Sequence, residues 1–124
     1  MAGFVTNIEE ASEKNENFRQ VLFTAPYSQL VVMSLQPNEN IGMEVHPQVD
    51  QFIRIEEGQG KAILNGEESA LAGGSAVVIP AGTEHDIVNT SATEALKLYT
   101  IYSPPQHPDG TIHKTKAEAL AKGD

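Results

Sequence analysis

Short segments in which apolar and polar residues alternate follow one another along most of this chain, and Gly, Pro and Asn residues separate them. A period of two places successive side chains on opposite faces, which is the pattern of a β-strand with one buried face. We expect eight or nine such strands, at residues 18–24, 30–35, 43–46, 50–56, 61–64, 67–70, 75–79, 84–89 and 96–102. Short strands at this regular spacing are typical of a sandwich or a barrel, so the sequence predicts an all-β fold.

Turn and capping signals refine this prediction. Asn65-Gly66 separates two predicted strands and suits a type I′ hairpin turn, in which both central residues have positive φ. Residues 71–74 are predicted to form a loop. Thr115 precedes Glu118 with the spacing of a capping box, which predicts a short C-terminal helix. Residues 9–15 are polar, and their pattern is compatible with either a helix or a loop.

The length and composition favour one small folded unit. The chain has 124 residues, of which 40% are hydrophobic, and this is enough for one core. We expect a single domain over residues 1–124, with a barrel core at about 18–103 and a C-terminal tail at 104–124. The chain has no Cys, so a metal site would have to use imidazole, carboxylate or amide ligands.

The charge balance argues against two classes of partner. The chain has 17 acidic and 8 basic residues, with a net charge of −9, and this surplus repels nucleic acids and anionic membrane surfaces. No apolar stretch approaches the roughly 20 residues that span a bilayer, and residues 1–10 do not resemble a secretion signal. We therefore expect a cytoplasmic protein that binds neither nucleic acid nor membrane.

Two segments carry side chains suited to a metal ion. Glu44 and His46 are two residues apart on a predicted strand, so they point to the same face. Gln51 begins the next predicted strand, where its side chain can turn back toward that face. His85 comes from a separate strand behind a Pro-Ala-Gly turn. Two imidazoles and a carboxylate that converge inside a barrel form a metal site of the two-His-one-carboxylate type.

These segments resemble the two motifs of the cupin superfamily. The second motif, G(X)5PXG(X)2H(X)3N, is matched at every fixed position by Gly74, Pro80, Gly82, His85 and Asn89. The resemblance implies a small single-domain cupin of type 2 character, whose fold is an antiparallel double-stranded β-helix, or jelly-roll barrel. We expect the Gly and Pro residues of the motif to shape turns and Asn89 to close one by hydrogen bonding.

The first cupin motif, G(X)5HXH(X)3,4E(X)6G, is matched in spacing but altered in content. His46 and Gly58 occupy family positions unchanged, whereas Asn38 replaces the opening Gly. Glu44 occupies the place of the first His, and Gln51 occupies the place of the Glu. The carboxylate has therefore moved from one position to another, and the number of negative charges is unchanged.

By this resemblance, the expected ligand set is Glu44, His46, Gln51 and His85 around one divalent ion: Fe, Mn, Ni, Co or Zn. Gln51 is the weakest member, because a neutral amide oxygen binds metals less well than carboxylate or imidazole. In the alternative role, Gln51 does not bind the ion itself but orients a bound water or Glu44.

The resemblance supports three functions. The first is a metal-dependent enzyme, of dioxygenase or other oxidoreductase type, that acts on a small polar substrate and uses Glu44 as a possible general base. The second is a sugar or sugar-phosphate isomerase; the candidates for binding its phosphate are Arg54, Lys61 and Lys97. The third is a binding module for a small molecule, without turnover.

Other residues leave two interpretations open. Tyr99 and Lys97 share one face of the last predicted core strand and are candidates for the substrate pocket, whereas the alternative places Lys97, like Arg54, on the outer barrel face. His107 and His113 lie among Pro and Gly residues, which predicts an exposed loop. Their alternative role is in a lid over the barrel mouth or an arm that reaches a partner.

The resemblance also implies a homodimer, because cupins commonly exchange an N-terminal strand between neighbours. Residues 18–24 are the candidate for that strand.

Overall fold

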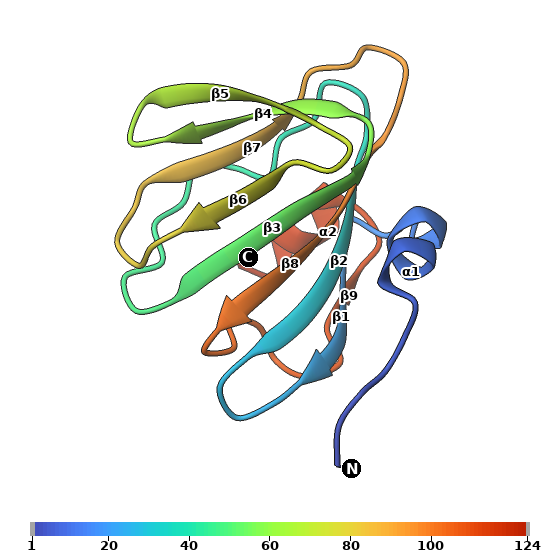
Figure 1. Ribbon diagram of the computed structural model, residues 1–124, viewed down its shortest axis with the longest axis vertical. Helices are drawn as coiled ribbons and strands as arrows, with labels where there is room; N and C mark the ends of the chain where they lie inside the picture. Colours follow the sequence, from blue (N-terminus) through green and yellow to red (C-terminus); the bar gives the residue numbers. More distant parts are fainter. Residues whose placement is uncertain (1, 124) are drawn as a thin grey trace.

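The computed structural model describes residues 2–123, which form two antiparallel β-sheets and two short helices (Figure 1). The larger sheet has the strand order β6-β3-β8-β2-β1-β9, and the smaller has the order β5-β4-β7. The bounds of the strands are β1 Arg19–Thr24, β2 Gln29–Leu35, β3 Asp50–Glu57, β4 Gln59–Leu64, β5 Glu67–Ala72, β6 Ala76–Ile79, β7 His85–Asn89, β8 Leu96–Ser103 and β9 Ile112–His113. The all-β prediction is confirmed.

The core lies between the sheets and follows the predicted alternation. On β3, Ile53 and Ile55 are buried whereas Arg54 between them is exposed. On β8, Leu96 and Leu98 are buried and belong to the same hydrophobic cluster. Burial of these alternate side chains is the main favourable contribution to folding, at about 25 cal/mol per Å² of apolar surface.

One predicted strand is reduced to a single bridge. Of residues 43–46, only Glu44 forms a β-bridge, with His85 on β7, and Asn40 forms another with Val88. Gly42 adopts a φ of 126° and Pro47 has no amide hydrogen to donate, so a continuous ladder cannot form here. The extended segment nevertheless lies along the edge of the smaller sheet and carries two of the candidate ligands.

The predicted hairpin turn is confirmed. Asn65 and Gly66 both have positive φ, at 49° and 83°, and connect β4 to β5. The loop predicted at 71–74 begins later than expected, because Leu71 and Ala72 still pair with β4.

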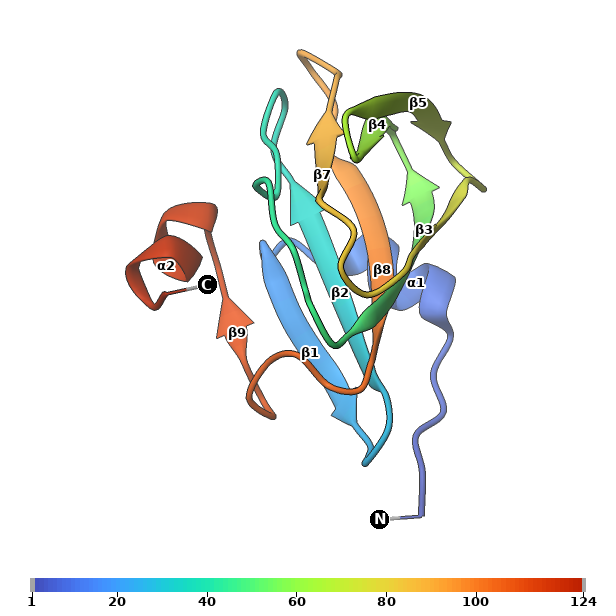
Figure 2. The ribbon, with the colours of Figure 1, turned by 90° about the vertical axis from the view of Figure 1, so that its left-hand side faces the viewer.

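Each helix has a side-chain cap. Asn7 caps α1 (Ile8–Lys14) by accepting from the backbone N–H of Glu10, which settles the ambiguous N-terminal segment as a helix. Thr115 caps α2 (Lys116–Ala121) by accepting from the backbone N–H of Glu118, as the capping-box spacing predicts. Helix α1 packs against the outer face of β2, β3 and β8, and Figure 2 shows α2 beyond β9, well separated from α1.

The C-terminal tail folds back onto the barrel, contrary to the exposed loop predicted for it. His107 and His113 are both buried. The side chain of Gln29 holds the tail by donating to His107 O and accepting from His107 N, at 2.7 and 3.0 Å. Strand β9 then pairs with β1. The sequence prediction was wrong because these long-range contacts leave no mark on the local Pro- and Gly-rich pattern.

Strand β1, the candidate for exchange between subunits, pairs with β2 and β9 of its own chain. The homodimer stays a prediction. Neither helix of residues 2–123 has the length and apolar character that a membrane-spanning helix requires.

Candidate metal centre

Three of the four predicted ligands form one cluster. Each of Glu44, His46 and His85 offers a ligand atom, and these atoms all lie within 4.8 Å of one another. Nitrogen and oxygen ligands lie about 2.0–2.2 Å from a transition-metal ion, which separates neighbouring ligand atoms by about 3 Å. Small rotations of the three side chains would therefore bring them onto one ion.

The backbone holds the two ligand-bearing segments together. Glu44 N donates to His85 O and His85 N donates to Glu44 O, each at 2.9 Å. Gly82 N donates to His46 O at 2.9 Å, which ties the turn before β7 to the segment that carries His46. Two short segments far apart in the sequence are thus fixed relative to each other by main-chain bonds. The carboxylate of Asp86 adds two more links by accepting from Asn40 Nδ2 and Gly42 N, at 2.7 and 2.9 Å.

The orientation of His85 suits metal binding. Its Nδ1 lies 2.9 Å from the carbonyl oxygen of Thr83. A carbonyl can only accept, so Nδ1 carries the hydrogen and Nε2 presents a lone pair. A backbone partner that fixes the ring and its tautomer in this way is a usual feature of metal-ligating histidines.

His46 is held in its neutral, metal-binding form. Burial lowers the pKa of His46 below its ordinary value of 6.5, and the charges of His85 and Arg19 lower this pKa further. Nε2 of His46 lies 4.0 Å from Oε2 of Glu44, and its ring centroid lies 5.2 Å from that of His85. A neutral imidazole beside a carboxylate can bind a metal without first releasing a proton.

Gln51 presents an unsatisfied acceptor inside the barrel. Its Nε2 donates to Oγ1 of Thr100 at 3.0 Å, whereas its buried Oε1 has no hydrogen-bond partner among residues 2–123. A buried acceptor without a partner costs about 1–3 kcal/mol, and coordination of an ion would remove that cost. This orphaned oxygen and the chemistry of the three clustered donors both fit a divalent metal.

The sequence profile of the Cupin domain family matches residues 31–102. The chain belongs to the cupin family. It is similar to YrkC of Bacillus subtilis, with 48% identity over 98% of this chain and 68% of the relative. It is also similar to protein L612 of Acanthamoeba polyphaga mimivirus, with 46% identity over 97% of this chain and 77% of the relative. The crystal structure of BH2720 from Bacillus halodurans superposes with a TM-score of 0.93 and 45% identity, and covers 95% of this chain and 93% of that one. The predicted cupin fold is therefore confirmed.

The two residues proposed for the substrate pocket of this cupin are not brought to the cluster. Lys97 and Tyr99 alternate with the buried residues of β8 and lie on its outer face. The Nζ of Lys97 donates to Asn15 O at the end of α1, and Tyr99 contacts the ring of Phe52. The alternative prediction for Lys97 placed it on this outer face. The position follows because Leu98, the next residue, faces the core and successive strand residues point to opposite faces.

The other two predicted basic candidates also point away from the barrel interior of the cupin. Arg54 is exposed and forms an ion pair with Glu56 at 3.4 Å. Lys61 forms an ion pair with Glu68 at 3.1 Å on the β4–β5 hairpin.

The sequence patterns did not indicate that Tyr102, Arg19 and His107 are buried. The ring of Tyr102 lies 6.0 Å from that of His46 and 5.1 Å from that of His107. Arg19 is buried on β1, on the same face as Val21. The alternation around Val21 could have indicated that Arg19 faces the core, whereas nothing local marks the tail residue His107.

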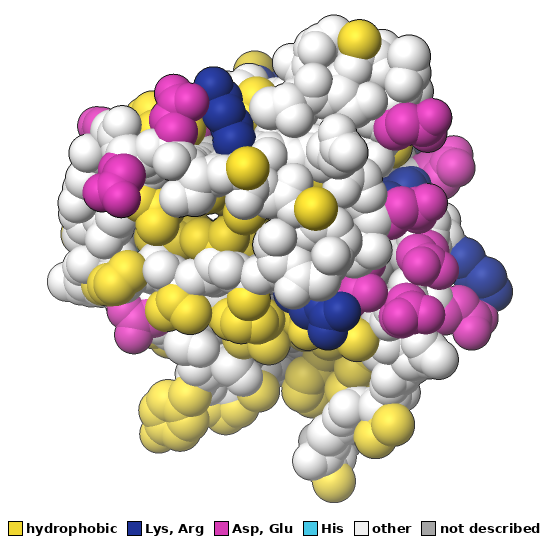
Figure 3. All heavy atoms as spheres, turned by 45° about the horizontal axis from the view of Figure 1, so that its top comes forward, with side chains coloured by type: hydrophobic (Ala, Val, Ile, Leu, Met, Phe, Trp, Pro, Cys, Tyr) yellow, Lys and Arg dark blue, Asp and Glu magenta, His cyan; other side chains and the backbone are white. Residues whose placement is uncertain are grey.

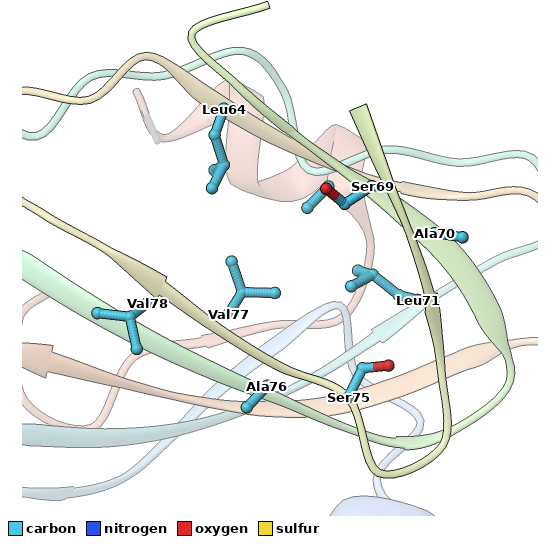
Figure 4. Close-up of a pocket in the computed structure, with 9 residues that line it drawn as sticks. Leu64, Ser69, Ala70, Leu71, Ser75, Ala76, Val77 and Val78 are labelled. Carbon is cyan, nitrogen blue, oxygen red and sulfur yellow. The ribbon is translucent and has the colours of Figure 1, made fainter. Parts of the chain in front are cut away.

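A cavity of about 430 Å³ lies where β5 and β6 form the edges of the two sheets. It is lined by residues of β4 and β5 and by residues 75–78, and none of the candidate ligands lines it. Hydrophobic side chains surround a hollow in Figure 3, and Figure 4 shows Leu64 and Val77 among the residues that line the cavity. Leu64 is the register partner of His85, so one residue that lines the cavity neighbours a candidate metal ligand.

Proposed function

We propose that this cupin is a metal-dependent enzyme of the oxidoreductase type, which acts on a small polar substrate. The observation that carries the proposal is the cluster of Glu44, His46 and His85 in a barrel whose fourth candidate ligand, Gln51, has an orphaned oxygen. A bound Fe, Mn, Co, Ni or Zn ion would supply Lewis-acid or redox chemistry there, according to its identity.

The protein residues contribute position and proton transfer. The main-chain bonds between Glu44 and His85 keep the ligands in place without a change of backbone. Glu44 is the most accessible of the clustered ligands, with a side chain 33% exposed, so it can both bind the ion and accept a proton from a substrate. Tyr102 and His46 form one wall of the site, where the buried rings exclude water.

The isomerase alternative receives less support. A phosphate group requires several cationic donors, yet Arg54 and Lys61 are already held in ion pairs and Lys97 binds the end of α1. The binding module without turnover is an outcome of the experiment that follows.

The test compares the wild type with Glu44→Gln after anaerobic loading with Fe(II) or Zn(II). Oxygen uptake and product formation are measured with a panel of small polar compounds. We expect substrate-dependent oxygen uptake in the Fe(II) form of the wild type and its loss in Glu44→Gln. Glu84→Gln is the matched control, because Glu84 is an exposed carboxylate next to His85 in the sequence.

Three results would contradict the proposal in different ways. Proton exchange at the carbon next to a sugar carbonyl, without oxygen uptake, would identify an isomerase. Stabilisation by a compound without any product would identify a binding module. Equal turnover in the wild type and Glu44→Gln would remove Glu44 from the site.

A further inference from the structure

The residues before Glu44 run along the outer edge of the smaller sheet, beside β7. Ile41 N donates to Ile87 O at 3.0 Å, and Glu44 and His85 exchange two main-chain bonds. Between these two points the row of bonds to the β7 main chain is interrupted at Gly42, whose φ of 126° turns the chain. The position of Glu44 therefore depends on what holds the chain at this interruption.

The carboxylate of Asp86 bridges the interruption. Its Oδ1 accepts from Gly42 N at 2.9 Å, and its Oδ2 accepts from Asn40 Nδ2 at 2.7 Å. The residue is only 5% exposed, so these bonds replace solvation that the carboxylate loses on burial. Successive strand residues point to opposite faces, so Asp86 points away from the face of His85 and holds the backbone near the ligands without binding the ion itself.

A lysine of helix α2 completes this network. Nζ of Lys116 donates to Oδ1 of Asn40 at 2.6 Å, so the amide of Asn40 links a cation to the carboxylate of Asp86. Hydrogen bonds in such a chain polarise and strengthen one another. The helix is itself anchored, because Ala119 is 1% exposed and belongs to the hydrophobic core. A continuous chain of contacts therefore joins α2 to the residue next to His85.

We propose that Asp86 is a positioning residue through which helix α2 sets the affinity of the metal centre. The inference concerns the regulation of the centre formed by Glu44, His46 and His85, and so rests on the proposed function. While the network is intact, Glu44 presents its carboxylate at a fixed position beside His85. When the network is broken, the segment before Glu44 gains freedom and the ion loses a fixed ligand. Partners that orient metal ligands from outside typically change metal affinity by about 10- to 100-fold.

The experiment measures the affinity and the visible spectrum of Co(II) in the wild type, Asp86→Asn, Lys116→Met and Lys116→Arg. Competition with a metal indicator gives the dissociation constant, and the d–d bands report the ligand geometry. Lys122→Met is the matched control, because it removes the same charge from an exposed position at the other end of α2. Urea unfolding of the metal-free forms measures stability separately from affinity.

We expect Asp86→Asn to weaken Co(II) binding by about tenfold or more, and Lys116→Met to weaken it by about three- to tenfold. Both variants should shift the d–d bands, because Glu44 no longer holds its position. Lys116→Arg should keep the wild-type affinity and spectrum, since it retains a charged donor to Asn40. Lys122→Met should keep them as well.

Wild-type affinity and spectrum in Lys116→Met would overturn the inference, even if Asp86→Asn failed to fold. A loss of stability in Asp86→Asn without any change in affinity would leave Asp86 a structural role only and overturn the inference too. An equal loss of affinity in Lys122→Met would attribute the effect to the charge of the helix and not to the network.

The two proposals fail in different ways. Protein that binds one Co(II) with the same affinity in every variant would end the positioning role and leave the metal-dependent function standing. Co(II) binding that depends on the network, without turnover of any compound by the Fe(II) form, would do the opposite. A wild type that binds no metal would contradict both.

Discussion

Glu44 and His85 face each other across an isolated antiparallel bridge, with both main-chain N–H···O distances at 2.9 Å. The bridge pairs two ligand positions from segments some forty residues apart in the chain. Its geometry depends on the backbone and not on the side chain at position 44. A Glu can therefore stand where the cupin motif has a His without displacing His85, which explains how the carboxylate can change position within the cupin ligand set.

Gln51 is expected to contribute to metal affinity through its orphaned oxygen. Gln51→Leu removes that oxygen and should weaken binding of Zn(II) or Co(II) by about tenfold or more. Thr100→Val removes the partner that orients the amide, and we expect a smaller loss in the same direction. Competition titration with a metal indicator gives both values. Wild-type affinity in Gln51→Leu would exclude Gln51 from the site.

Asn89 is expected to be structural. Its Nδ2 donates to the carbonyls of Leu35, Gln36 and Glu94 at 2.8–3.1 Å, and its Oδ1 accepts from Ser91 N. Asn89→Ala leaves several of these groups without a partner and should lower the free energy of unfolding by about 3 kcal/mol in urea denaturation. The metal content of the folded variant should equal that of the wild type; a selective loss of metal would give Asn89 a direct role in the site.

Two motif glycines offer a matched pair of substitutions. Both have positive φ, 104° at Gly58 and 94° at Gly74. A Cβ at Gly58 would lie 2.6 Å from Ala95 O, whereas one at Gly74 would meet nothing within 4 Å. Gly74→Ala should therefore cost only the backbone strain of about 1–3 kcal/mol, and Gly58→Ala should cost more. Thermal or urea unfolding compares the two, and equal losses would contradict the steric argument.

His46 should make the stability of the metal-free protein depend on pH. Its folded-state pKa lies below the ordinary value of 6.5, so the unfolded chain binds a proton more readily. The contribution of His46 to the free energy of unfolding therefore rises as the pH increases from its folded-state pKa to its unfolded-state pKa, near 6.5. This contribution is lost again as the pH falls from 6.5 through the folded-state pKa. His46→Gln, measured in chelator, should flatten the profile in that window. An unchanged slope would show that His46 titrates normally.

Much of the barrel could be predicted because it depends on local signals. The alternation around Ile53 and Leu98 reports which face is buried, and the dipeptide Asn65-Gly66 specifies its own turn. The spacing of the cupin motifs brought together Glu44, His46 and His85 from two segments. Each of these predictions needs only the residues within a few positions, or a spacing fixed by the family.

What could not be predicted depends on contacts between distant segments. His107 is buried because Gln29, at the start of β2, binds its backbone. His113 is buried where β9 returns from the tail to pair with β1. The local sequence of the tail, rich in Pro and Gly, describes an exposed loop equally well. The face of Lys97, by contrast, could have been assigned from the apolar neighbours Leu96 and Leu98.

The metal content of the reconstituted protein tests the central claim most directly. After loading with Fe(II), Mn(II), Co(II), Ni(II) or Zn(II) and removal of excess ion, elemental analysis should find about one ion per chain in the wild type and in Glu84→Gln. Glu44→Gln, His46→Ala and His85→Ala should each lose most of it. A wild type that retains none of these ions, or histidine variants that retain as much as the wild type, would contradict the account.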